Sequence, residues 1–290
     1  MRDTLDRVNE ALSRSIAGVK SAGCPPKLAE AMRYAVFPGG ARIRPRLCLS
    51  VAAACQEDEP ATSNAAAVAI ELLHCASLVH DDLPCFDDAE VRRGKTSVHK
   101  VYGEEIAVLA GDGLIVLAFE CLATSNPGRA RRSVDLVEIV ARSVSAARGI
   151  IGGQAWESET AIDLKRYHNA KTGSLFAAST EAGAVAAGAD GAQWRALGAR
   201  LGEAYQVADD IRDAFGDSDK MGKPVGKDVA LGRPSAVAEL GIGGAKARLK
   251  NQIRRAVEAI PECPGAMALR DTILFETNKF LPPEILRQAA

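Results

Sequence analysis

One long apolar run, at residues 64–80, reads NAAAVAIELLHCASLVH. It is rich in Ala and Leu and is longer than an ordinary strand, which favours a helix. Segments of alternating β-branched residues between tight turns are nearly absent from the chain. Runs that are apolar around most of a helix belong inside a bundle, so the sequence predicts an all-α fold, a single large helical bundle. Further runs of this kind cover residues 104–123, 134–150, 171–188, 192–215 and 244–259.

The length of 290 residues suits one large or two ordinary domains. No linker divides the predicted helices, so we expect one domain over residues 1–290. Hydrophobic residues make up 47% of the chain, which excludes the disordered and collagen-like classes. The net charge is −1, so no overall field attracts nucleic acid or an anionic membrane.

The seven Cys residues show neither a CxxC pair nor a zinc-ligand spacing. Unpatterned thiols in a chain of this length are typical of a reducing cytoplasm, so we expect a cytoplasmic, soluble protein. The first residues lack the apolar run of a signal peptide. The most apolar stretch, residues 106–123, contains Asp112 and Glu120, which argues against a membrane-spanning helix.

Four carboxylates follow the first apolar run. Residues 80–88 read HDDLPCFDD, with Asp at positions 81, 82, 87 and 88. So many anions repel one another unless cations compensate, and the C-terminus of a helix favours cations over anions. On this segment alone, a metal site and a solvated helix end are equally good interpretations.

A second acidic cluster follows a later apolar run. Residues 205–213 read YQVADDIRD, in which Asp209 and Asp213 share a helix face and Asp210 lies beside them. Carboxylate oxygens suit Mg²⁺, which keeps several waters and commonly bridges protein carboxylates to phosphates. Two such clusters, on helices that face one another, would hold several Mg²⁺ ions around one polyphosphate. Two unrelated surface clusters are the alternative interpretation.

Basic residues fall in the turns around these clusters, where a diphosphate site needs cations. Arg binds phosphate with a two-pronged fork, and Lys adds a mobile charge. Lys171 also opens a predicted helix, where backbone N–H groups favour anions. Any one basic pair is commonly a solvated surface feature, but their order along the chain favours a diphosphate site. They are Arg42 and Arg44 in GGARIRP (39–45), Arg92 and Arg93 in RRG (92–94), Lys171 in KTG (171–173), and Lys223 and Lys227 in GKPVGKD (222–228).

Together with GGQ at 152–154, these motifs resemble the trans-isoprenyl diphosphate synthases over essentially residues 35–230. The chain is most similar to the short-chain farnesyl and geranylgeranyl diphosphate synthases, and among these to enzymes of bacterial carotenoid pathways. The resemblance implies a helical bundle of the isoprenoid synthase type around a central apolar tunnel. It also implies a homodimer and three Mg²⁺ ions, with Mn²⁺ as an alternative ion.

The implied reaction is a head-to-tail condensation of isopentenyl diphosphate with dimethylallyl, geranyl or farnesyl diphosphate. The allylic diphosphate ionises, and the double bond of isopentenyl diphosphate attacks the carbocation. A proton is then lost, and the released pyrophosphate is the implied base. Ordered cations stabilise the charge on the leaving group, and an apolar tunnel keeps water from the carbocation.

The resemblance assigns roles residue by residue. The implied metal ligands are Asp81, Asp87 and Asp209, supported by Asp82, Asp210 and Asp213. The implied contacts of the allylic diphosphate are Arg92, Lys171 and Lys227, and Lys223 is a further expected substrate-binding residue. Those of isopentenyl diphosphate are Arg42, Arg44, Arg93 and His74, although His74 can also be interpreted as a core histidine. The implied lining of the carbocation region is Thr172 and Gln206.

Two positions depart from the family pattern. The family usually has Lys where this chain has Ala41, so we expect Arg42 or another cation to replace one contact of isopentenyl diphosphate. Many members carry an apolar residue where this chain has Arg212. The side chain of Arg212 is expected to point either to solvent or to a phosphate.

Product length depends on the residues one turn before Asp81. Ala76 and Ser77 occupy that turn, and both are small. In related enzymes, a bulky aromatic at one of these positions stops growth at fifteen carbons. The floor of the tunnel is therefore expected deeper, at Leu73 or on a facing helix. Geranylgeranyl diphosphate is the favoured product, and farnesyl diphosphate is the alternative.

Two other function classes are less favoured. A class I terpene cyclase would carry an Asn/Ser/Glu metal motif in place of the second Asp cluster. It would also be richer in aromatics than the 4% found here, because aromatic faces stabilise cyclic cations. A non-catalytic regulatory subunit would lack one acidic motif, and both are intact in this chain.

Overall fold

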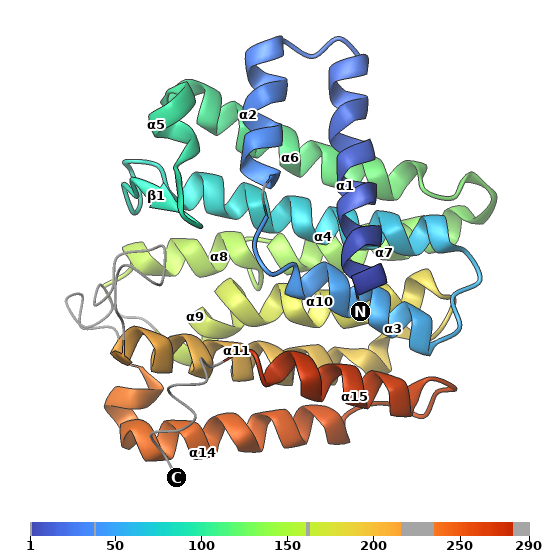
Figure 1. Cartoon of the computed structure of the whole chain (residues 1–290), viewed down its shortest axis with the longest axis vertical. Coiled ribbons are helices and arrows are strands. Elements are labelled where there is room, and N and C mark those ends of the chain that lie inside the picture. Colours follow the sequence, from blue (N-terminus) through green and yellow to red (C-terminus); the bar gives the residue numbers. More distant parts are fainter. Residues whose placement is uncertain (1, 38, 161–162, 216–234, 281–290) are drawn as a thin grey trace. The chain divides into compact units, whose positions relative to one another are not determined.

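The computed structural model describes residues 2–37, 39–160, 163–215 and 235–280. Helices dominate these residues and the strands form one short hairpin, so the all-α prediction is confirmed (Figure 1). The chain groups into two compact units. Unit 1 spans Met1–Val140 and Ala182–Ala189, and unit 2 spans Ala141–Glu181 and Asp190–Ala290. The single domain stays a prediction.

The elements that begin in unit 1 are α1 (Arg2–Ser21), α2 (Pro26–Val36), α3 (Ile43–Ala54), α4 (Pro60–Asp81), β1 (Val91–Arg92), β2 (Lys95–Thr96), α5 (Val98–Tyr102), α6 (Glu104–Thr124), the 3-10 turn η1 (Pro127–Arg129) and α7 (Ala130–Val144). Those that begin in unit 2 are α8 (Ile150–Ala155), η2 (Trp156–Ser158), α9 (Leu164–His168), the π-helical turn η3 (Asn169–Gly173), α10 (Ser174–Ala186), η4 (Gly191–Trp194), α11 (Arg195–Phe215), α14 (Ala236–Glu258) and α15 (Ala266–Thr277).

Helix α4 forms the centre of unit 1 and contains the apolar run at 64–80. Pro60 stands in its first turn, where a missing N–H costs nothing. Ala66, Ile70 and Leu72 along it are fully buried, and α3 and α6 pack against it (Figure 1). A Cβ at Gly111 of α6 would lie 2.0 Å from Nε2 of His80, so only glycine lets α6 approach the end of α4 so closely. The position of the first acidic motif follows from this packing.

Helix α11 forms the centre of unit 2 and packs against α14 and the π-helical turn (Figure 1). A Cβ at Gly202 would lie 2.8 Å from Cα of Gly173, and one at Gly198 would lie 2.3 Å from the carbonyl oxygen of Phe176. These two glycines let α11 lie directly on the backbone that carries the KTG motif.

Some boundaries differ from the sequence predictions. The helix predicted at 134–150 ends at Val144, and a new helix begins at Ile150. A Cβ at Gly149 would lie 2.3 Å from the backbone N of Ser145, so this turn requires glycine. The hairpin β1–β2 was not predicted. Its two-residue loop, Arg93 and Gly94, has φ values of 55° and 74°, which a type I′ turn requires.

Two described helices, α4 and α6, are long and apolar enough to cross a membrane by length and composition. In α4 the apolar window is 72% buried, as befits the core helix of a globular unit, whereas in α6 it is 39% buried. The exposed part of α6 therefore presents apolar side chains at the surface of unit 1.

Candidate active site

The first acidic motif folds back on the end of α4. The backbone N–H of Asp87 donates to the carbonyl of Asp81 at 3.0 Å, and that of Ala89 donates to the carbonyl of Asp82 at 3.1 Å. The loop between them therefore closes on the helix end and brings the backbones of Asp81 and Asp87 together. The backbone of the motif is therefore compact, and the grouping of its carboxylates around a metal stays a prediction.

Arg92 from strand β1 anchors the motif. Its Nε donates to Oδ1 of Asp82 at 2.8 Å, and its Nη2 lies 3.9 Å from Oδ2 of Asp81. Burial raises the pKa of Asp82 above its usual value, although Arg92 works against that rise. Burial also disfavours the charge on Arg92, but the hydrogen bond and charge of Asp82 outweigh it and raise the pKa of Arg92. The hairpin thus brings a firmly charged guanidinium to the acidic motif.

His74 lies between two of the predicted diphosphate-binding arginines. Its Nε2 is 2.9 Å from Nη2 of Arg93 and 3.4 Å from Nη1 of Arg44. Burial, together with the surrounding arginine charges, holds the pKa of His74 well below its usual range. A neutral imidazole can accept from a guanidinium, so His74 orients its neighbours. A Cβ at Gly40 would lie 2.8 Å from Nε of Arg93, so the glycine of GGARIRP leaves room for this arrangement.

Arg42 has a different environment from the one predicted. Its Nη1 lies 2.5 Å from Oε1 of Glu71, and both side chains are 1% exposed. Its Nη2 donates to the carbonyl of Val36 at 2.6 Å. This buried pair argues against the predicted role of Arg42 as a diphosphate contact and as the replacement for the usual Lys at 41. Glu71 was not identified from the sequence. Its one distinguishing feature in the sequence is that it is a single acidic residue inside an apolar run.

In unit 2, Lys171 lies in the π-helical turn and meets a carboxylate that sequence reasoning also missed. Its Nζ is 2.6 Å from Oε1 of Glu157, which also accepts from the hydroxyl of Tyr167 at 2.6 Å. Nε2 of Gln154, from the GGQ motif, donates to Oε2 of Glu157 at 3.1 Å. A Cβ at Gly153 would lie 2.5 Å from the backbone N of Lys171. The GGQ motif therefore positions α8 against Lys171.

A chain of hydrogen bonds leads from the KTG motif to the second acidic motif. The hydroxyl of Thr172 donates to Oε1 of Gln206 at 3.0 Å, and Nε2 of Gln206 donates to Oδ1 of Asp210 at 3.0 Å. Oδ2 of Asp210 accepts from the backbone N–H of Ala236 at 2.7 Å, at the beginning of α14. Thr172 and Gln206 are therefore neighbours, and their role in lining the carbocation region stays a prediction. Asp210 therefore accepts hydrogen bonds both from Gln206 and from the start of α14.

Arg212 does not extend freely into solvent, because its side chain is 19% exposed, and its contact with a phosphate stays a prediction. Its Nη2 donates to Oδ1 of Asp209 at 2.7 Å, and its Nη1 donates to the carbonyl of Phe280 at 3.2 Å. Its guanidinium carbon lies 5.3 Å from the ring centroid of Tyr205. Burial disfavours its charge, but Asp209 outweighs burial and raises the pKa of Arg212. Asp209 thus has a cationic neighbour on its own helix.

The carboxylates fit magnesium in their chemistry. In the described ranges, no three carboxylate, imidazole or thiolate groups converge to form a complete metal site. Mg²⁺ does not need such a cage, because waters and substrate phosphates complete its coordination. The side chains of Asp81 and Asp209 are 15% and 28% exposed, so both have access to solvent. The two acidic motifs lie in separate units, and their face-to-face placement stays a prediction. Lys223 and Lys227 lie outside the described residues.

The predicted chain-length residues lie on α4 in different settings. Ala76 and Leu73 are buried, at 1% and 3% exposure. Ser77, one turn before Asp81, is partly exposed, and its hydroxyl donates to the carbonyl of His74 at 2.8 Å. Of the three, Ser77 is the side chain on the Asp81 face with access to solvent.

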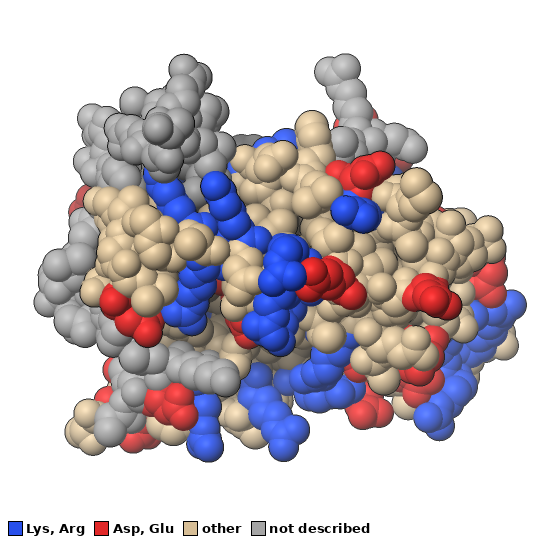
Figure 2. All heavy atoms as spheres, turned by 90° about the horizontal axis from the view of Figure 1, so that it is seen from below, with Lys and Arg blue, Asp and Glu red and all other residues tan. Residues whose placement is uncertain are grey.

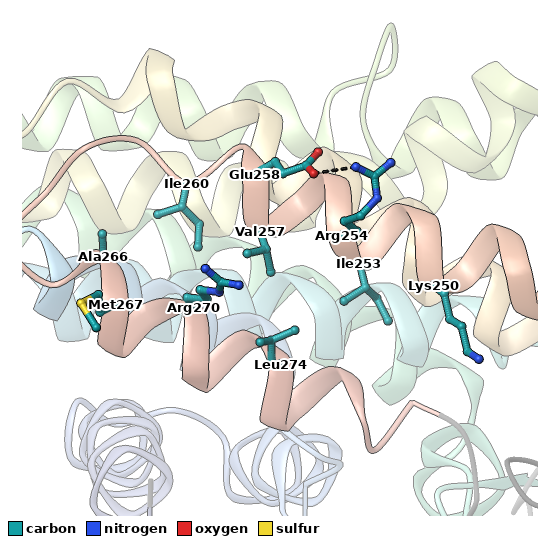
Figure 3. Close-up of a pocket in the computed structure, with 10 residues that line it drawn as sticks. All are labelled: Lys250, Ile253, Arg254, Val257, Glu258, Ile260, Ala266, Met267, Arg270 and Leu274. Atoms are coloured by element: carbon teal, nitrogen blue, oxygen red, sulfur yellow. Dashed lines mark hydrogen bonds and ion pairs between the residues drawn. The ribbon is translucent and has the colours of Figure 1, made fainter.

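A groove of about 510 Å³ lies between α14 and α15 of unit 2, apart from the predicted site residues (Figure 3). It combines apolar with basic side chains, among them Ile253, Val257, Leu274, Lys250 and Arg270. Figure 2 views the molecule from the side on which α14 lies in Figure 1. Lys and Arg gather along the middle of that face, with Asp and Glu between and beside them. Such mixed charge agrees with the net charge of −1.

Known proteins resemble this chain in sequence and in fold. The polyprenyl synthetase family model matches residues 25–269. A geranylgeranyl diphosphate synthase of Cereibacter sphaeroides is 52% identical, over 96% of this chain and 97% of that protein. A farnesyl diphosphate synthase of Geobacillus stearothermophilus is 42% identical, over 86% of each chain. The crystal structure of a geranyltransferase from Helicobacter pylori, complexed with magnesium and isoprenyl diphosphate, has a TM-score of 0.77 and 30% identity and covers 95% of this chain and 98% of that one. The chain therefore belongs to the polyprenyl synthetase family of prenyltransferases.

Proposed function

We propose that the chain elongates allylic diphosphates with isopentenyl diphosphate and that its main product is geranylgeranyl diphosphate. One observation carries this proposal: both acidic motifs are intact, and each has an arginine directly at its carboxylates. The likeness to geranylgeranyl diphosphate synthases supports geranylgeranyl diphosphate as the product. The likeness, at lower identity, to a farnesyl diphosphate synthase supports farnesyl diphosphate as the alternative product. A terpene cyclase or a regulatory subunit would not need two such motifs.

The charged side chains would bind and neutralise the diphosphate groups. Asp81, Asp87 and Asp209 would hold magnesium, with three ions proposed and Mn²⁺ as an alternative. Bound magnesium would stabilise the charge that develops on the leaving pyrophosphate. Arg92 would contact the allylic diphosphate beside the first motif, because its guanidinium already lies 3.9 Å from Asp81. Lys171 would do so from unit 2.

Isopentenyl diphosphate would bind at Arg44, Arg93 and His74 in unit 1. Because the pKa of His74 is held low, the imidazole accepts from the guanidiniums and leaves their charge intact for the diphosphate. Thr172 and Gln206 would present oxygen atoms to the carbocation. No side chain of the described site stands out as the final base, and pyrophosphate is the proposed acceptor of the proton.

Removal of magnesium tests the proposed chemistry. Chelation of divalent ions should abolish elongation, because the diphosphates then lose the charge neutralisation that ionisation requires. Product formation is measured from labelled isopentenyl diphosphate before chelation, after chelation and after addition of Mg²⁺ or Mn²⁺. Elongation that persists in excess chelator would contradict the proposal.

Product length depends on the size of the α4 side chains beneath the first motif. Ala76→Phe should shift the main product from twenty to fifteen carbons, because an aromatic ring would block the tunnel near its mouth. Chromatography of the dephosphorylated products measures the shift. Ala76 is buried, and a large side chain there can strain the packing, so Ser77→Phe at the partly exposed neighbour is the second test. An unchanged product profile in both folded variants would refute the proposed path of the growing chain past these two positions.

We propose a homodimer that forms through the exposed apolar face of α6. Val108, Leu109 and Val116 on this helix are 41%, 49% and 65% exposed, and apolar patches of this kind mark interaction surfaces. A second copy of the chain is the proposed occupant. The proposed location is the cytoplasm, with no nucleic-acid partner and no membrane span.

Leu109→Glu combined with Val116→Glu should halve the molar mass in solution, because charges on this face would be buried in the dimer. Light scattering after size exclusion measures the mass. Val134→Glu is the matched control, since Val134 is a similarly exposed apolar residue, at 59%, on a different helix, α7. A wild-type mass equal to one chain would contradict the homodimer, and a doubled mass in the α6 variant would exclude this face as its interface.

A further inference from the structure

The turn before α3 lacks the cation that the family places there. Position 41 is Ala and cannot contact a diphosphate through a charge. The neighbouring Arg42 forms the buried pair with Glu71 described above. Another cation in unit 1 would therefore have to take over this contact.

Lys95 on strand β2 reaches this turn from the hairpin. Its Nζ donates to the carbonyl of Phe37 at 2.9 Å and lies 3.5 Å from the ring centroid of Tyr34. Phe37 caps the C-terminal end of α2, two residues before Gly39 of the turn at residues 39–41. Lys95 is also the cross-strand partner of Arg92, so the two side chains leave the hairpin on one face. The ammonium thus lies between the hairpin and the turn.

A cavity joins Lys95 to Arg93 of the proposed isopentenyl diphosphate site and to Arg92 of the proposed allylic diphosphate site. Lys95, Arg92 and Arg93 line this cavity together. Gly40 of the turn lies directly against the side chain of Arg93. A Cβ added at Gly40 would overlap the guanidinium. The turn that lacks a cation at 41 therefore contacts Arg93, which lines the same cavity as Lys95.

Lys95 differs from its neighbours in how its charge is compensated. Arg42 pairs with Glu71, and Arg92 pairs with Asp82. Within the part of the chain that the structure describes, Lys95 has a carbonyl and an aromatic ring as partners and no carboxylate. Burial lowers the pKa of Lys95, which indicates that its charge is incompletely stabilised. An incoming anion would supply the missing compensation.

We propose that Lys95 supplies the contact to isopentenyl diphosphate that Ala41 cannot make. The inference rests on the proposed function. An ammonium has three N–H donors, so Lys95 can keep its bond to Phe37 and direct another N–H toward the diphosphate. Lys95 is therefore a specificity determinant for isopentenyl diphosphate in unit 1, together with Arg44 and Arg93.

A purely structural role makes a different prediction. The carbonyl of Phe37 lies at the C-terminus of α2, and a lysine there can stabilise a helix end. Loss of such a contact would lower the melting temperature and affect both substrates alike. The test must therefore separate the two substrates and also report stability.

Lys95→Met should weaken the binding of isopentenyl diphosphate roughly 10-fold to 100-fold, the range expected for a hydrogen bond to a charged group. Titration calorimetry with isopentenyl diphosphate and Mg²⁺, without an allylic partner, measures this binding. The KM for farnesyl diphosphate should stay within about twofold of wild type. Lys95→Arg should bind nearly as well as wild type, and Lys250→Met on α14 is the control.

Ala41→Lys provides the decisive rescue. Added to Lys95→Met, it should restore binding, because it places a cation on the other side of the same turn. A purely structural role for Lys95 predicts no rescue. Unchanged binding in Lys95→Met, an equal rise of both KM values, or failure of Ala41→Lys to rescue would each overturn the inference. Absence of elongation by the wild type would instead refute the proposed function, since the calorimetric result does not depend on turnover.

Discussion

Asp81→Asn is expected to lower kcat for elongation by about 10²-fold or more, the scale of losing one preorganised electrostatic group. Asp81 lies at the end of α4 with a partly exposed carboxylate, in the position proposed for a metal ligand. The buried hydrogen bonds of Arg92 go to Asp82, so loss of the Asp81 charge leaves that anchor intact. The melting temperature should therefore change little while activity falls.

Steady-state elongation at saturating Mg²⁺, together with thermal melting, measures this difference. Asp271→Asn is the matched control, since Asp271 is an exposed carboxylate on α15 outside both acidic motifs. Asp82→Asn should behave differently, because its carboxylate is buried against Arg92 and its loss should lower stability as well as activity. Near wild-type kcat in Asp81→Asn would contradict the ligand assignment.

Arg42→Met is expected to destabilise the protein by about 3–5 kcal/mol, the usual cost of removing one partner of a buried ion pair. Glu71 would then be left as an unpaired carboxylate at the centre of unit 1, and the carbonyl of Val36 would lose its donor. The pair joins the turn before α3 to the core helix α4. Its loss should therefore also disturb Arg44, which follows Arg42 in the same segment.

Denaturant unfolding followed by circular dichroism measures this cost. Arg254→Met is the matched control, because its pair with Glu258 is 64% and 56% exposed and should contribute about 0–1 kcal/mol. Removal of both charges in Arg42→Met/Glu71→Leu should recover part of the loss, since no charge then stays buried alone. A cost for Arg42→Met as small as that of the control would show that the pair is not buried in solution.

The sequence identified candidate site residues but not their detailed contacts. Asp81, Asp209, Lys171 and Arg93 stood out because their motifs are local and ordered along the chain, and their roles stay predictions. Partners that are distant in sequence carry no such signal. Glu71 lies 29 residues from Arg42, and only folding shows that the two meet. Glu157 is closer to its motif, three residues after Gln154, but a surface acid would look the same in the sequence.

In the fold, too, local sequence patterns were predictive and contacts between distant segments were not. The apolar runs predicted helices correctly because burial requires a continuous apolar surface. Their ends depended on close backbone contacts, as at Gly149, which no periodicity reveals. The hairpin at 91–96 was missed because two-residue strands have no measurable alternation, although Arg93-Gly94 has the positive φ values of a tight turn.

Chain elongation by the purified protein is the most direct test of the proposed prenyltransferase activity. The protein is incubated with Mg²⁺, labelled isopentenyl diphosphate and dimethylallyl, geranyl or farnesyl diphosphate in turn, and the products are separated by chain length. We expect labelled geranylgeranyl diphosphate as the main product, formed from farnesyl diphosphate in a single addition. Absence of any elongated product with every primer would contradict the proposed activity.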